Sequence, residues 1–105
     1  MAKIQIYFGT ERKAGSTSQR YVVVHDLYGD GHAVRVARDL TFDHLVGYLE
    51  GATAGRWGQV NLVTDLGKNP TEELAEHGLR PLAKGRLAQL LEKARLSEHY
   101  SQLLG

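Results

Sequence analysis

The stretch RYVVVHDLYGDGHAVRVARD, residues 20–39, decides the fold of this chain. Its first half is apolar and β-branched at successive positions, which is typical of a central strand covered on both faces. Asp30 and Gly31 then separate two strand-like runs, and Asp-Gly is a strong signal for a two-residue type I′ hairpin turn. The stretch therefore predicts two antiparallel strands, over residues 20–28 and 33–39.

A register follows from this turn. With Asp30 and Gly31 at its centre, opposite charges meet across the two strands, a contact that contributes roughly 0.2–1 kcal/mol to a hairpin. The predicted pairs are Leu27 with Val34, His25 with Val36, and Asp26 with Arg35.

Other segments are predicted outward from this hairpin. Residues 3–8 alternate apolar and polar side chains, which indicates a strand, whereas residues 9–19 are rich in Gly, Ser and Thr and predict a loop. Thr41 is a suitable N-cap for a helix over residues 42–50 that ends at Gly51. The remaining predicted elements are a strand over 59–64, a short helix from Asn69 to His77, and a last helix from Pro81 to about Leu104.

The predicted order is β-β-β-α-β-α-α, without an internal repeat or a linker. We therefore expect a single globular domain over residues 1–105. The expected fold class is α+β, with a four-stranded, mostly antiparallel (mixed) sheet and the helices on one face.

Composition excludes several function classes. The 105 residues contain no Cys, which removes disulfides, thiolate metal sites and cysteine nucleophiles and fits a reducing compartment. No apolar run is long enough to span a membrane, and the first residues lack the order of a signal peptide. We expect a cytoplasmic protein without a membrane partner.

The charge is unevenly distributed although its sum is only +1. Residues 1–39, 40–79 and 80–105 carry net charges of +2, −4 and +3. Such asymmetry gives a domain a dipole that steers charged partners. Nucleic-acid-binding domains usually carry a larger basic excess, which weakens that class without excluding it.

The densest cluster of reactive side chains is His25, Asp26, Tyr28, Asp30 and His32. His25, Asp26 and His32 could serve as metal ligands or as a general base with its orienting carboxylate, which defines a metal-dependent enzyme as one alternative. Adjacent residues of a strand point to opposite faces, however, so His25 and Asp26 cannot bind one ion. We expect a structural role for this cluster and assign no catalytic residue, metal or cofactor.

Two loops carry candidate contact residues. The segment 9–20 holds Arg12, Lys13 and Arg20, which either form a solvated loop or an arm that grips a phosphate backbone or an acidic protein surface. The segment 51–58 holds Arg56 and Trp57, the only Trp, which either closes the end of the core or anchors a partner.

The last predicted helix has two apolar stripes that lie more than 100° apart. Either the helix breaks near Ser97 and the tail folds back on its own core, or the second stripe meets a partner, in the simplest case a second copy. The first stripe is Ala83, Leu87, Leu90, Leu91 and Ala94, and the second is Leu96, Tyr100, Leu103 and Leu104.

These observations favour a small, non-enzymatic protein-interaction domain, of the size and composition of bacterial or phage accessory proteins. Its expected partner is a protein or a second copy of the chain. The alternative is a nucleic-acid-binding module that uses two basic segments. Its residues would be Arg12, Lys13 and Arg20 in the loop and Arg80, Lys84, Arg86, Lys93 and Arg95 in the last helix.

Overall fold

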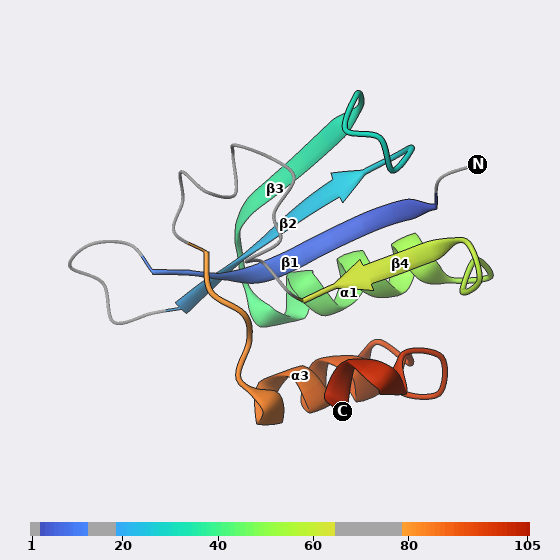
Figure 1. The fold of residues 1–105 in the computed structure, drawn as a ribbon. Coiled ribbons are helices and arrows are strands. Elements are labelled where there is room, and N and C mark those ends of the chain that lie inside the picture. Colours follow the sequence, from blue (N-terminus) through green and yellow to red (C-terminus); the bar gives the residue numbers. More distant parts are fainter. Residues whose placement is uncertain (1–2, 13–18, 65–78) are drawn as a thin grey trace.

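Four strands form one mixed sheet in the order β3-β2-β1-β4 (Figure 1). The computed structural model describes residues 3–12, 19–64 and 79–105. β1 pairs antiparallel with β2 and parallel with β4, and β2 pairs antiparallel with β3, which confirms the predicted mixed α+β sheet. The short helix predicted from Asn69 to His77 lies outside the described residues. The strands are β1 (Ile4–Arg12), β2 (Gln19–Asp26), β3 (Val34–Leu40) and β4 (Val60–Val63).

Two α-helices, α1 (Phe42–Thr53) and α3 (Lys84–Lys93), pack on the same face of this sheet, followed by a 3-10 turn, η2 (Ser101–Leu104). The period-2 pattern of β1 sends Ile6 and Phe8 to this face, where both side chains are fully buried. Among the described helices, none combines the length and the apolar character that crossing a membrane requires. The main core also contains Tyr21, Val23, Leu45, Leu49, Val60, Leu62, Leu87, Leu90, Leu91, Ala94, Leu96 and Tyr100.

The opposite face of the sheet carries a smaller buried cluster of Tyr7, Val22 and Val24. Since Tyr21 and Val23 face the helices, β2 is buried on both sides over residues 21–24. This confirms that the apolar run of residues 21–24 belongs to a central strand.

β1 is longer than predicted. Residues 9–12 continue the strand and pair with β2 as far as Arg12, opposite Gln19, so the predicted loop over 9–19 is wrong at both ends. The polar side chains of this stretch concealed the strand. Glu11, for example, is buried although it is charged, and it forms an ion pair with Arg38 of β3. Residues 13–18 lie outside the described part of the chain.

The turn between β2 and β3 is also longer than predicted, and it shifts the register. His25 pairs with Arg35 and Asp26 with Val34, so the expected pairing of Asp26 with Arg35 is wrong. The Asp26 carboxylate instead accepts hydrogen bonds from the backbone N–H of Gly29, at 2.9 Å, and of Gly31, at 3.1 Å. Both glycines have positive φ, 77° and 82°, which side-chain-bearing residues rarely adopt. A buried acceptor therefore organises a wide turn over residues 27–33 in place of a type I′ turn.

α1 begins as predicted and ends later. The Thr41 side chain accepts from the backbone N–H of His44 at 3.2 Å, which confirms the N-cap. Gly51 lies within the helix, which continues to Thr53, whose hydroxyl donates to the Leu49 carbonyl at 2.6 Å. Gly55, with φ of 72°, adopts the left-handed conformation that the sequence suggested for Gly51.

The predicted last helix breaks, which is the alternative in which the tail folds back on the chain's own core. α3 ends at Lys93, Arg95 adopts a φ of 60°, and the backbone N–H of Leu96 donates back to the Leu91 carbonyl at 2.7 Å. Leu96 and Tyr100 consequently enter the chain's own core. The expectation that they form a partner surface with Leu103 and Leu104 is wrong, because the last two leucines also pack, partly buried, against that core.

Candidate functional site

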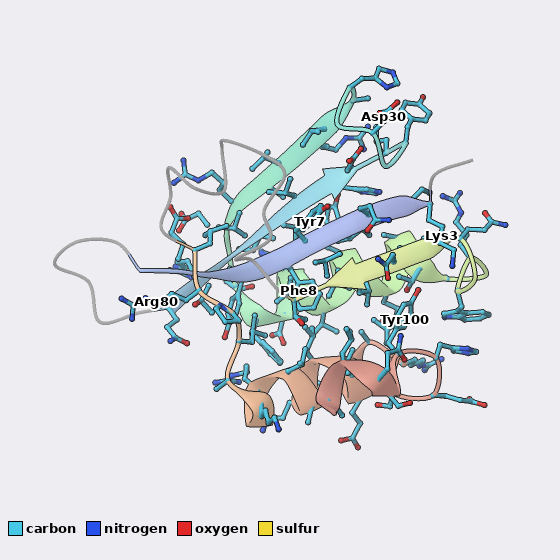
Figure 2. The ribbon with its side chains drawn as sticks, in the orientation of Figure 1. Lys3, Tyr7, Phe8, Asp30, Arg80 and Tyr100 are labelled. Carbon is cyan, nitrogen blue, oxygen red and sulfur yellow. The ribbon has the colours of Figure 1, made fainter. Side chains whose placement is uncertain are left out.

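One end of the sheet gathers most of the exposed aromatic side chains of the described residues. β1 begins there, with Ile4 opposite Val60 of β4, and β2 ends there, with Asp26 opposite Val34 of β3. The loops 27–33 and 54–59 therefore emerge at the same end as Lys3 (Figure 2). We call this surface the Trp57 end and define it by Tyr28, His32, Arg35, Arg56, Trp57 and His99.

Trp57 projects from a loop that is fixed at both sides. The backbone N–H of Arg56 donates to the Thr53 carbonyl at 2.8 Å, and the Arg56 carbonyl accepts from the N–H of Val60 at 3.2 Å. The indole ring stacks on the ring of His99, with centroids 4.3 Å apart and planes 13° apart. Even so, Trp57 is 42% exposed, so the ring is held in place without being buried in the core.

Tyr100 connects this loop to the C-terminal segment. Its hydroxyl donates to the Val60 carbonyl at 2.8 Å and lies 3.3 Å from the Trp57 carbonyl. Burial raises the pKa of the Tyr100 hydroxyl, which keeps it a donor. Of the sequence-predicted contact residues, Arg56, Trp57 and Tyr100 are thus brought together, with Tyr100 as a support beneath the loop.

Tyr28 forms the second exposed aromatic group. It is 56% exposed and stacks on His32, with ring centroids 4.9 Å apart and planes 13° apart. The Asp30 carboxylate lies 2.8 Å from Nδ1 of His32 and accepts from the His32 backbone N–H at 3.0 Å. The backbone N–H of His32, and then its side chain, lower the pKa of Asp30. The turn that Asp26 organises therefore presents a preformed Tyr–His stack.

His25 lies near the end of β2, on the helix face of the sheet, opposite Ile6 of β1. Its Nδ1 is 2.9 Å from the Tyr48 hydroxyl of α1, and the two rings meet edge to face with centroids 5.9 Å apart. Burial lowers the pKa of the His25 ring, and the positive charges of Arg35 and Arg56 lower it further against the opposing effect of Asp26. The ring is therefore neutral at pH 7.

The metal-dependent alternative centred on His25, Asp26 and His32 is not supported by this arrangement. His25 faces α1, Asp26 is bonded within the turn, and His32 is held by Asp30 at the surface. No group of three or more His, Cys, Asp or Glu side chains in the described ranges could hold a metal ion. His25 and Asp26 are adjacent in sequence but point to opposite faces of β2, and the wide turn keeps His32 away from both.

Of the predicted basic residues, Arg20 and Arg80 lie at the opposite end of the sheet, whereas Arg86 and Lys93 lie along α3. Arg20 forms an ion pair with Asp39 at 3.6 Å, and the side chain of Arg12 and all of Lys13 lie outside the described part. Thr10 and Arg80 exchange two backbone hydrogen bonds, of 2.8 and 3.1 Å, which join the β1–β2 hairpin to the segment before α3. On α3, Arg86 and Lys93 lie over the ring of Phe42, at 4.7 and 5.6 Å from its centroid.

Sequence reasoning missed three contributors to the Trp57 end. His99 resembles an isolated helix residue in the sequence, yet the break after α3 places it under Trp57. The register predicted from the sequence pairs Arg35 with Asp26, whereas in the structure Arg35 is opposite His25. Tyr28 was placed inside a strand, whereas it stands in the exposed turn.

Comparisons with models of protein families, with curated proteins and with solved structures find no match. The functional argument therefore depends on the chemistry of the Trp57 end.

Proposed function

We propose that this chain is a protein-interaction domain whose contact surface is the Trp57 end. The observation that carries the proposal is the pair Tyr28 and Trp57, the two large hydrophobic side chains that the described residues leave exposed. Both lie at the same end of the sheet, and each is stacked on an imidazole ring.

This arrangement has the features of a binding hot spot. Trp, Tyr and Arg are the residues whose truncation most often costs binding energy at protein interfaces. Ordering an exposed side chain on binding costs about 0.5–1.5 kcal/mol, and the stacking on His32 and His99 meets much of that cost before the partner arrives. Arg56 adds a guanidinium group next to the indole in sequence.

A comparative capture experiment tests this proposal. Immobilised wild-type protein, Trp57→Ala, Tyr28→Ala and a control, His44→Ala, would be exposed to a lysate of the source organism, and the retained proteins identified by mass spectrometry. His44 is exposed near the start of α1, whereas the loop of Trp57 follows the end of that helix. We expect proteins that wild type and His44→Ala retain and that both aromatic variants lose. Equal retention by all four proteins would contradict the proposal.

A nucleic-acid-binding function is the second candidate, and one observation favours it. The Thr10–Arg80 backbone bonds join β1 to the segment before α3, so that Arg80 lies beside the strand that ends at Arg12. Phosphate contacts release counterions, so binding through this surface would weaken steeply as salt rises. A salt titration with random DNA and RNA checks this, with Arg80→Gln and Lys84→Gln as variants. Binding that is absent at low salt, or unaffected by the variants, would exclude this function for the surface around Arg80 and Lys84.

A further inference from the structure

We propose that the exposed side of α3 carries a binding site for a terminal phosphate group, either inorganic phosphate or a phosphate monoester. The site is an open hollow of about 590 Å³, lined by Arg86, Gln89, Glu92 and Lys93. It shares no residue with the Trp57 end, so this inference goes beyond the proposed interaction function and does not depend on it.

Two cationic groups of this hollow converge on one aromatic ring. The guanidinium carbon of Arg86 lies 4.7 Å from the centroid of the Phe42 ring, and the ammonium nitrogen of Lys93 lies 5.6 Å from the same centroid. Both distances fall within the range of cation–π contacts, which extends to about 6 Å. The Phe42 ring is itself held in place, because it packs on Tyr21 and against the main core. One fixed ring therefore gathers two positive charges beside α3.

The helical repeat adds a neutral donor between these charges. Arg86 and Lys93 are two turns apart, so they leave α3 in directions only about 20° apart, and Gln89 lies between them on the same side. The amide oxygen of Gln89 accepts from Nη1 of Arg86 at 3.3 Å. The NH₂ group of Gln89 is therefore available to donate to a ligand. A guanidinium, an amide and an ammonium group follow one another along this side of the helix.

No carboxylate neutralises the two cations in the part of the chain that the structure describes. Neither Arg86 nor Lys93 forms an ion pair there. Glu92 also lines the hollow, but it lies about 100° from Lys93 around the helix, at the rim. Like charges that share one ring repel each other, and an anion bound between them offsets this repulsion. The chemistry of the hollow therefore favours an anionic ligand.

The number and type of donors favour phosphate over carboxylate. A terminal phosphate has three oxygens that accept from three separate groups, whereas a carboxylate has two oxygens that match one guanidinium fork. A phosphate monoester carries a charge of about −1.5 to −2 at pH 7, which matches Arg86 and Lys93 together. All four lining residues are exposed, so the remainder of a monoester can extend into water.

The test is an NMR titration of the ¹⁵N-labelled protein with inorganic phosphate and with phosphoserine. We expect saturable shifts of the backbone amides of α3 and of Nε of Arg86, in the millimolar range because the hollow is open to water. Acetate and dimethyl phosphate, which carry a single charge, are expected to bind more weakly. Tighter binding of phosphoserine than of inorganic phosphate would identify a phosphorylated side chain as the source of the group, and the reverse order a free phosphate.

Matched single variants separate this site from general charge attraction. Arg86→Gln and Lys93→Gln are each expected to weaken phosphate binding about three- to tenfold, through the loss of a charge-assisted contact. Lys84→Gln removes the same charge from the same helix, but Lys84 lies about 180° from Lys93, so binding should be nearly unchanged. Glu92→Gln removes a repulsive charge from the rim and should strengthen binding.

Four outcomes would overturn this inference. They are an equal loss of binding in Lys84→Gln, weaker binding in Glu92→Gln, binding of acetate or dimethyl phosphate as tight as that of phosphate, and shifts that do not saturate. Thermal melts check that each variant is folded. None of these outcomes bears on the capture experiment with Trp57→Ala, which tests the interaction function itself.

Discussion

The Asp26 carboxylate is buried beneath its own turn and accepts the backbone N–H of Gly31 through both oxygens, at 3.1 and 3.3 Å. We predict that Asp26→Ala destabilises the fold by about 1–3 kcal/mol, because it leaves the N–H groups of Gly29 and Gly31 without this acceptor. Arg35→Ala is expected to have little effect on stability.

Urea denaturation of the two single variants and the double variant checks this. The double-mutant coupling between Asp26 and Arg35 should be close to zero, since the residues are not paired across the hairpin. A coupling of about 1 kcal/mol would restore the register that the sequence suggested.

Tyr100→Phe removes the hydroxyl that fastens the Trp57 loop to the C-terminal segment. We expect a loss of about 1 kcal/mol in stability, because the Val60 carbonyl loses a buried hydrogen bond. Trp57 is the only Trp, so its fluorescence reports directly on the loop, and we expect the emission to shift as the indole becomes more mobile. Tyr28→Phe, at an exposed tyrosine, is the control that should leave both stability and emission nearly unchanged.

Leu96→Ala tests the placement of the C-terminal segment. Leu96 is fully buried in the chain's own core, so we expect a loss of about 2–5 kcal/mol, as for other large-to-small core substitutions. Leu104→Ala, at a partly buried position, should cost less. Thermal melts measure the stability of each variant, and light scattering measures its molar mass. A variant that changes the molar mass while keeping its full stability would show that Leu96 serves an interface instead.

The lowered pKa of His25 gives the fold a pH dependence with a defined sign. Well above pH 6.5 the ring is neutral in both the folded and the unfolded chain, so its titration does not affect stability there. As the pH falls below 6.5, the unfolded chain takes up the proton first, so stability decreases until the folded-state pKa is passed.

The free energy of unfolding between pH 7.5 and 5 should therefore fall less steeply in His25→Asn than in the wild type. The lowered pKa of Asp30 stabilises the fold at neutral pH, and this effect is lost only as the pH falls from the ordinary pKa of a carboxyl group to the lowered one. An identical slope in wild type and His25→Asn would show that burial and the two arginines do not disfavour the charged ring.

Sequence patterns predicted the elements that are specified by interactions between residues close in sequence. The alternation in residues 3–8, the Thr41 cap and the apolar run of residues 21–24 each specify an element through neighbouring residues, and the structure contains all three. From these elements the order of the chain was sufficient to derive the mixed sheet.

The candidate site depended on long-range contacts that local patterns do not contain. A two-residue turn was the best local interpretation of Asp-Gly, but a buried acceptor at Asp26 made the turn wider and moved Arg35 next to His25. Likewise, the left-handed conformation at Arg95 is unusual for a non-glycine residue, and only this break places His99 under Trp57. The sequence therefore identifies Arg56 and Trp57 as contact residues but does not reveal that His99 supports the indole ring.

The parallel pairing of β1 with β4 also governs how the chain assembles. β1, β2 and β3 follow one another in the chain, so each pairs with a strand that is close in sequence. Ile4 and Val60, in contrast, are separated in sequence by β2, β3 and α1. Contacts between such distant residues form late and slow the folding of a small domain. Until Val60–Val63 docks, one edge of β1 has unpaired backbone groups, and open strand edges are where folding intermediates associate. We therefore expect the pairing of β4 with β1 to be the folding step at which misassembly occurs, so that variants that weaken β4 reduce the yield of refolding more than they reduce equilibrium stability.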